Sequence, residues 1–90
     1  MDYNFKVVAK LRDDLTDEEH KMAFERLTKW QRKYKMINID EITYRKAGPI
    51  QNYDDFGAVA FFYCVLKDFK ECFEKLEYYD FGEGIKRVAI

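Results

Sequence analysis

The sequence predicts one α+β domain with six elements in the order strand, helix, strand, strand, helix, strand. Two observations lead to this order. Apolar residues recur every three or four positions over 20–34 and 69–79, the spacing of helices that bury one face. The segments around them are rich in Val, Ile, Phe and Tyr, which favour strands. A length of 90 residues without a linker or repeat fits a single domain over 1–90.

The first strand and the first helix have the clearest local signals. Apolar and polar residues alternate over 3–11, as in a strand with one buried face. Thr16 stands at the position of a helix N-cap, and Glu19 follows three residues later, where its side chain can complete a capping box. The helix then carries an apolar stripe formed by His20, Ala23, Phe24, Leu27, Trp30 and Tyr34.

Two strands, a helix and a final strand are expected in the rest of the chain. The second strand is 37–46, with a bulge or break near Asp40 because its apolar residues change parity there. The third strand is 56–66. A helix beginning near Asp68 ends at the glycines that precede the last strand, 85–90.

The run 56–66 is apolar on both faces of the expected strand. Two helices with one apolar stripe each can cover one face of a sheet, which leaves the other face open. We expect one set of side chains to face the core: Phe56, Phe62, Cys64 and Leu66. The other set, with one residue of the first strand, is the predicted protein-binding surface: Val59, Phe61, Tyr63 and Val8.

This order of elements is that of the ferredoxin-like βαββαβ sandwich, in which a four-stranded antiparallel sheet carries two helices on one face. The run 56–66 would then be a central strand of that sheet, next to the first strand. The exposed aromatic residues would lie in the middle of the open sheet face.

The composition offers little for catalysis. The chain contains no serine and a single histidine, His20, which we interpret as a packed or helix-capping residue. Cys64 and Cys72 are interpreted as reduced thiols, and their spacing from His20 matches no usual zinc site. Acidic pairs such as Asp13 and Asp14 fall at turns and helix starts, where capping explains them. We expect no catalytic residue, no metal and no cofactor.

The expected location in the cell is inferred from two kinds of segment that the sequence lacks. No apolar stretch reaches the length that spans a bilayer, and the residues from Met1 to Lys6 have none of the features of a secretory signal. We therefore expect a cytoplasmic protein without a membrane partner.

Several short segments, at 3–8, 15–19, 44–50 and 86–88, resemble the family of the sixth protein of the small ribosomal subunit. The most specific is Tyr44-Arg45-Lys46-Ala47-Gly48-Pro49-Ile50, which resembles the basic, proline-containing end of that family's second strand. The resemblance implies a ferredoxin-like domain that binds ribosomal RNA and a neighbouring protein without catalysis. The residues that it implies as phosphate contacts are Arg45, Lys46 and Arg87.

Two binding functions follow. With 16 basic and 17 acidic residues the net charge is −1, which favours a protein partner over a polyanion. The first prediction is therefore a small regulator or inhibitor of the phage type that binds a host protein, with homodimerisation through the sheet face as a variant. The alternative is an RNA–protein assembly module in which Lys6 and Lys10 join the three basic residues named above.

Overall fold

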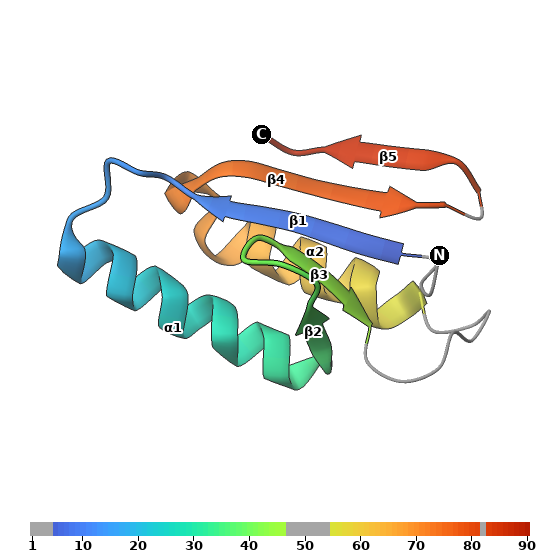
Figure 1. The fold of residues 1–90 in the computed structure, drawn as a ribbon, viewed down its shortest axis with the longest axis horizontal. Helices are drawn as coiled ribbons and strands as arrows, with labels where there is room; N and C mark the ends of the chain where they lie inside the picture. Colours follow the sequence, from blue (N-terminus) through green and yellow to red (C-terminus); the bar gives the residue numbers. More distant parts are fainter. Residues whose placement is uncertain (1–4, 47–54, 82) are drawn as a thin grey trace.

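The computed structural model describes residues 5–46, 55–81 and 83–90. In this part of the chain five antiparallel strands form one sheet, in the order β2-β3-β1-β4-β5 (Figure 1). The elements are β1 (Phe5–Leu11), α1 (Asp17–Lys33), β2 (Met36–Asn38), β3 (Thr43–Lys46), α2 (Asp55–Phe69), the 3₁₀ turn η1 (Lys70–Cys72), β4 (Phe73–Asp80) and β5 (Ile85–Val88).

β1 is the central strand, and the alternation in its sequence is confirmed. Val7 and Ala9 are buried in the core beneath the two helices. Lys6 and Lys10 alternate with them and so point to the opposite face of the sheet. β1 pairs with β3 on one side and with β4 on the other.

α1 begins with the capping box that the sequence predicts. The Thr16 hydroxyl accepts a hydrogen bond from the Glu19 amide at 3.1 Å, and the Glu19 carboxylate accepts one from the Thr16 amide at 3.0 Å. Ala23 and Leu27 are the buried residues of the predicted stripe. His20, however, is exposed, so its interpretation as a packed residue is wrong: it lies in the first turn, before the helix reaches the core.

The segment 56–66 is not a strand. It lies in α2, and the strand prediction is therefore wrong. The reason is the period: a run that is apolar at nearly every position fits the strand period and the helical period equally well, and here the helical period places its largest side chains on one side. The buried residues of this helix are Ala58, Phe61, Phe62, Val65 and Phe69.

The predicted helix from Asp68 is also wrong, because it is the 3₁₀ turn η1 followed by β4. A register shift between Lys10 and Leu11 makes Lys10 pair with Lys75 and Leu11 pair with Phe73. This bulge spaces two core residues of β4, Phe73 and Leu76, three positions apart. Residues three positions apart also lie on one side of a helix, so the apolar pattern of this segment fits a helix as well.

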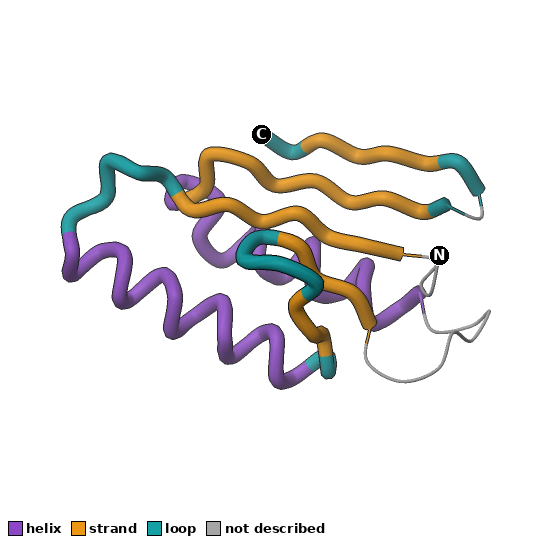
Figure 2. The backbone as a smooth tube through the Cα atoms, in the orientation of Figure 1, coloured by secondary structure: helices purple, strands orange, loops and turns teal. Residues whose placement is uncertain are grey.

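The fold class, α+β with two helices and an antiparallel sheet, is confirmed, with five strands where four were predicted. β5 is the predicted last strand and pairs with β4. The number of strands differs because the predicted strand 37–46 forms both β2 and β3, and β4 replaces the predicted helix, whereas 56–66 lies in α2. Buried residues of α1, α2 and four strands form one cluster, so both helices cover the same face of the sheet (Figure 2). Its largest fully buried side chains are Phe61, Phe69, Leu76, Val7 and Val65.

Candidate nucleic-acid interface

The sheet face turned away from α1 and α2 is called the open face below. Strand alternation and the pairing register assign its residues. Basic side chains predominate among them, together with one tyrosine. The members are Ile37 of β2, Lys6, Val8 and Lys10 of β1, Thr43 and Arg45 of β3, Lys75, Glu77 and Tyr79 of β4, and Lys86 and Val88 of β5.

One row of the open face crosses three strands and combines an aromatic ring with two cations. Tyr79 on β4 pairs with Lys6 of β1 and with Lys86 of β5. The Lys6 ammonium lies 4.6 Å from the centroid of the Tyr79 ring, and the Lys86 ammonium lies 5.2 Å from it. The pairing of the strands thus places a positive charge on each side of the ring, at distances typical of cation–π contacts.

Phe81 extends this row beyond the end of β4. Its ring stacks on Tyr79, with the centroids 6.2 Å apart and the planes 15° from parallel. The Lys6 ammonium also lies 5.6 Å from the Phe81 centroid. Phe81 keeps 37% of its surface exposed. The open face therefore has a two-ring platform with lysines at its border, which we call the Tyr79 platform: Lys6, Tyr79, Phe81 and Lys86.

The Tyr79 hydroxyl interacts with the side chains of Glu77 and Lys86. The Tyr79 hydroxyl donates to a Glu77 carboxylate oxygen at 2.5 Å. The interaction with the Tyr79 side chain raises the pKa of Lys86 above its ordinary value, so this lysine remains cationic across the physiological range.

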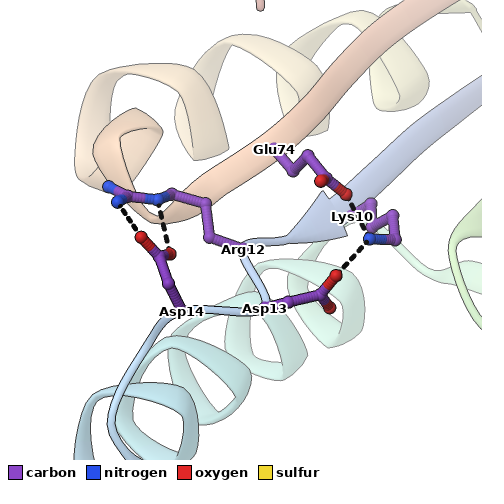
Figure 3. A network of polar contacts seen from close by, with 5 residues as sticks. All are labelled: Lys10, Arg12, Asp13, Asp14 and Glu74. Atoms are coloured by element: carbon purple, nitrogen blue, oxygen red, sulfur yellow. Dashed lines mark hydrogen bonds and ion pairs between the residues drawn. The ribbon is translucent and has the colours of Figure 1, made fainter.

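Lys10 lies at the other end of the open face in a network of ion pairs (Figure 3). Its ammonium contacts Glu74 and also lies 3.4 Å from an Asp13 oxygen. The hydrogen bond to Glu74 is the main cause that raises the pKa of Lys10. Nearby, Arg12 binds Asp14 through two nitrogens, at 2.9 and 2.5 Å. Lys10 is thus largely neutralised by carboxylates, whereas Lys6 and Lys86 contact aromatic rings.

The residues predicted to form a protein-binding surface are not brought together. Phe61 is completely buried, and Val59 is partly buried against the core, so the prediction that they form an exposed sheet face is wrong. Tyr63 is on the outer side of α2 and is 37% exposed. Val8 alone lies on the open face, where it is 8% exposed between its paired neighbours Thr43 and Glu77.

The structure brings together part of the predicted RNA-binding set. Lys6, Lys10 and Arg45 lie on the open face. Arg87 pairs with the core residue Tyr78 and so belongs to the opposite face, on the exposed edge strand. The backbone of Lys46 pairs with Met36. The residues 47–50 of the ribosomal-type motif lie outside the described residues.

Sequence reasoning missed Tyr79, Phe81 and Lys86. Their signal was available as strand alternation, because Leu76 and Tyr78 are buried whereas Glu77 and Tyr79 between them belong to the other face. The helix prediction for this segment concealed it.

The described residues offer no metal site, since they contain no group of three or more His, Cys, Asp or Glu side chains that could hold an ion. Cys64 and Cys72 are free thiols, and the Cys64 sulfur lies 3.4 Å from the Tyr34 hydroxyl. No helix in the described ranges is long and apolar enough to cross a membrane. No family model, no curated protein and no solved structure matches the chain.

Proposed function

We propose that this protein is a non-catalytic module whose open face binds single-stranded nucleic acid, RNA in particular. The observation that carries the proposal is the Tyr79 platform, in which two rings are bordered by lysines from two different strands. Aromatic side chains on a sheet stack unpaired bases, and adjacent cations neutralise the phosphates between them. Binding of this kind requires no catalytic nucleophile, no general base and no metal ion.

The net charge of −1 is compatible with this proposal because the charges are unevenly distributed. Acidic residues gather where β1 turns into α1: Asp13, Asp14, Asp17, Glu18 and Glu19. Basic residues predominate on the open face, at Lys6, Arg45, Lys75 and Lys86. A polyanion responds to the local potential over a Debye length of about 10 Å, and less to the total charge of the chain.

We also propose that β1 to β4 with α1 and α2 correspond to a ferredoxin-like domain and that β5 is an added strand. The element order and the sheet order β2-β3-β1-β4 support this correspondence. β5 enlarges the open face and supplies Lys86. The ribosomal resemblance agrees with the kind of ligand, but 56–66, the expected third strand of such a domain, lies in α2. The proposal therefore rests on the platform.

The test is fluorescence anisotropy with a labelled oligouridylate of about ten nucleotides. The open-face variant carries Lys6→Ala and Lys86→Ala. Its matched control carries Lys29→Ala and Arg32→Ala, which remove the same charge from the exposed side of α1. Binding is measured from about 50 to 200 mM salt, because each phosphate contact on a single strand contributes about −0.7 to the slope of log K against log salt.

We expect the open-face variant to bind at least about tenfold more weakly and to reduce the magnitude of the salt slope by about 1.4, with little change in the control. Equal losses in both variants would indicate nonspecific attraction and would contradict the proposal. Absence of binding by the unchanged protein at the lowest salt concentration would also contradict it.

A further inference from the structure

A hollow of about 580 Å³ lies between α1, β1 and the turn that joins β2 to β3. Its volume is in the range of binding pockets. Polar side chains at one end are paired with one another, since Gln31 donates to the Asn38 side chain at 2.9 Å. The apolar lining residues are Ala9, Leu11, Phe24, Leu27 and Ile42, with Tyr44 beside them.

Phe24 extends the apolar surface out of this hollow. Its side chain is 56% exposed, although most other exposed residues of α1 are polar. A second hollow of about 490 Å³ lies on its other side, lined also by Glu25, Thr28, Lys29 and Arg32. The ring is therefore a ridge between two hollows. A surface of this length suits a segment of chain better than a small molecule, which would need enclosure.

The rim of the first hollow is acidic. Asp13, Asp40 and Glu41 line it, and all three are exposed. The Asp40 carboxylate accepts hydrogen bonds from the amides of Ile42 and Thr43, at 3.0 and 2.9 Å, which hold the pKa of Asp40 below its ordinary value. The Asp40 carboxylate therefore stays charged at neutral pH.

The other titratable groups on the rim do not reverse this sign. Among the described residues that line the hollow, Lys10 is the one lysine, and its ammonium is already paired with Asp13 and Glu74. His20 completes the set. The acidic rim belongs to the first hollow alone, because the second is lined by Lys29 and Arg32 as well as Glu25. The first hollow therefore favours an occupant that combines an apolar side chain with positive charge.

We propose that this hollow docks a segment of a partner protein in which apolar anchor residues are flanked by lysine or arginine. Charge complementarity selects this occupant. A second copy of the chain docked about a two-fold axis would place one acidic rim against another, which like-charge repulsion opposes. The hollow shares Lys10 with the open face but contains no residue of the Tyr79 platform, so a protein and a nucleic acid could be bound together.

The probe is a labelled helical peptide of leucine and lysine, with a leucine–glutamate peptide of the same pattern as its control. Phe24→Ala is compared with Met22→Ala, because both residues are 56% exposed on α1 but Met22 does not line the hollow. Glu41→Lys tests the charge. The fold of each variant is checked by circular dichroism, and the site is mapped on the unchanged protein by amide chemical shifts.

We expect the lysine peptide to bind with shifts confined to residues 9–13, to α1 and to residues 38–44, and the glutamate peptide to bind at least about tenfold more weakly. Phe24→Ala is expected to weaken binding about tenfold or more and Met22→Ala about twofold or less. Glu41→Lys should also weaken it. Equal binding of the two peptides, equal effects of the two alanine variants, or shifts that map to the open face would overturn the proposal. So would absence of binding at millimolar peptide.

Discussion

The Lys6 ammonium lies 4.6 Å from the centroid of the Tyr79 ring, and the same two residues are direct partners across β1 and β4. The contact thus follows from the register of the sheet. A one-residue slip would turn every side chain of the strand to the other face, so the burial of Val7 and Ala9 also holds Lys6 in place. The core on one face determines the platform on the other.

The Tyr79 ring, more than its hydroxyl, is expected to bind nucleic acid. Tyr79→Ala should weaken oligouridylate binding by about 1–3 kcal/mol, the usual contribution of one stacked base. Tyr79→Phe keeps the ring and loses the hydrogen bond to Glu77, so it should bind within about threefold of the unchanged protein. Anisotropy titrations compare the two. Similar losses in both variants would assign the binding to the hydroxyl instead.

The helical assignment of 56–66 makes a stability prediction. Phe61→Ala should lower the free energy of unfolding by about 3–5 kcal/mol, because the ring is fully buried and the substitution leaves a cavity. Tyr63→Ala, two residues away on the outer side of α2, should cost less than about 1 kcal/mol. Urea denaturation measures both. A strand with Phe61 and Tyr63 on the same exposed face would give two small and similar values.

The capping box of α1 predicts a dependence on pH. The Thr16 amide donates to the Glu19 carboxylate, and this bond holds the pKa of Glu19 below its ordinary value of 4.5. A lowered pKa in the folded state contributes stability above 4.5, and this contribution is lost as pH falls through the folded-state pKa. Glu19→Gln should therefore be less stable at pH 7, and its difference from the unchanged protein should diminish in acid. Denaturant titrations at several pH values measure it; a difference that grows in acid would contradict the assignment.

Asp68 joins the two helices. Its carboxylate accepts a hydrogen bond from the Trp30 indole at 3.0 Å and lies 3.4 Å from the Arg26 guanidinium. Asp68→Ala should destabilise the protein by about 1–2 kcal/mol and change the emission of Trp30. Asp68→Asn keeps an acceptor for the indole and should lose less. Equal losses for the two substitutions would show that the charge, and not the hydrogen bond, is responsible.

Local signals predicted the first half of the fold. Strand alternation in β1 and the capping box at Thr16 and Glu19 depend on neighbouring residues, and both are confirmed. The break near Asp40 is confirmed as the turn between β2 and β3, where the Asp40 side chain binds two backbone amides.

The second half could not be predicted in the same way, because its apolar residues satisfy two periods at once. The residues 56–66 fit a strand buried on both faces as well as a helix, and the interval from Phe73 to Leu76 fits a helix although a bulge produces it. Tertiary packing decides between these alternatives. One of the four platform residues was nevertheless predicted: Lys6 is a candidate of the sequence analysis, whereas Tyr79 needed the register of β4.

The most direct test of the open face is a chemical-shift titration of the labelled protein with oligouridylate. The account predicts the largest changes at Lys6, Tyr79, Phe81 and Lys86, with small changes along α1. Changes confined to residues 9–13, α1 and residues 38–44, or no changes at millimolar oligonucleotide, would contradict the assignment of the open face to nucleic acid.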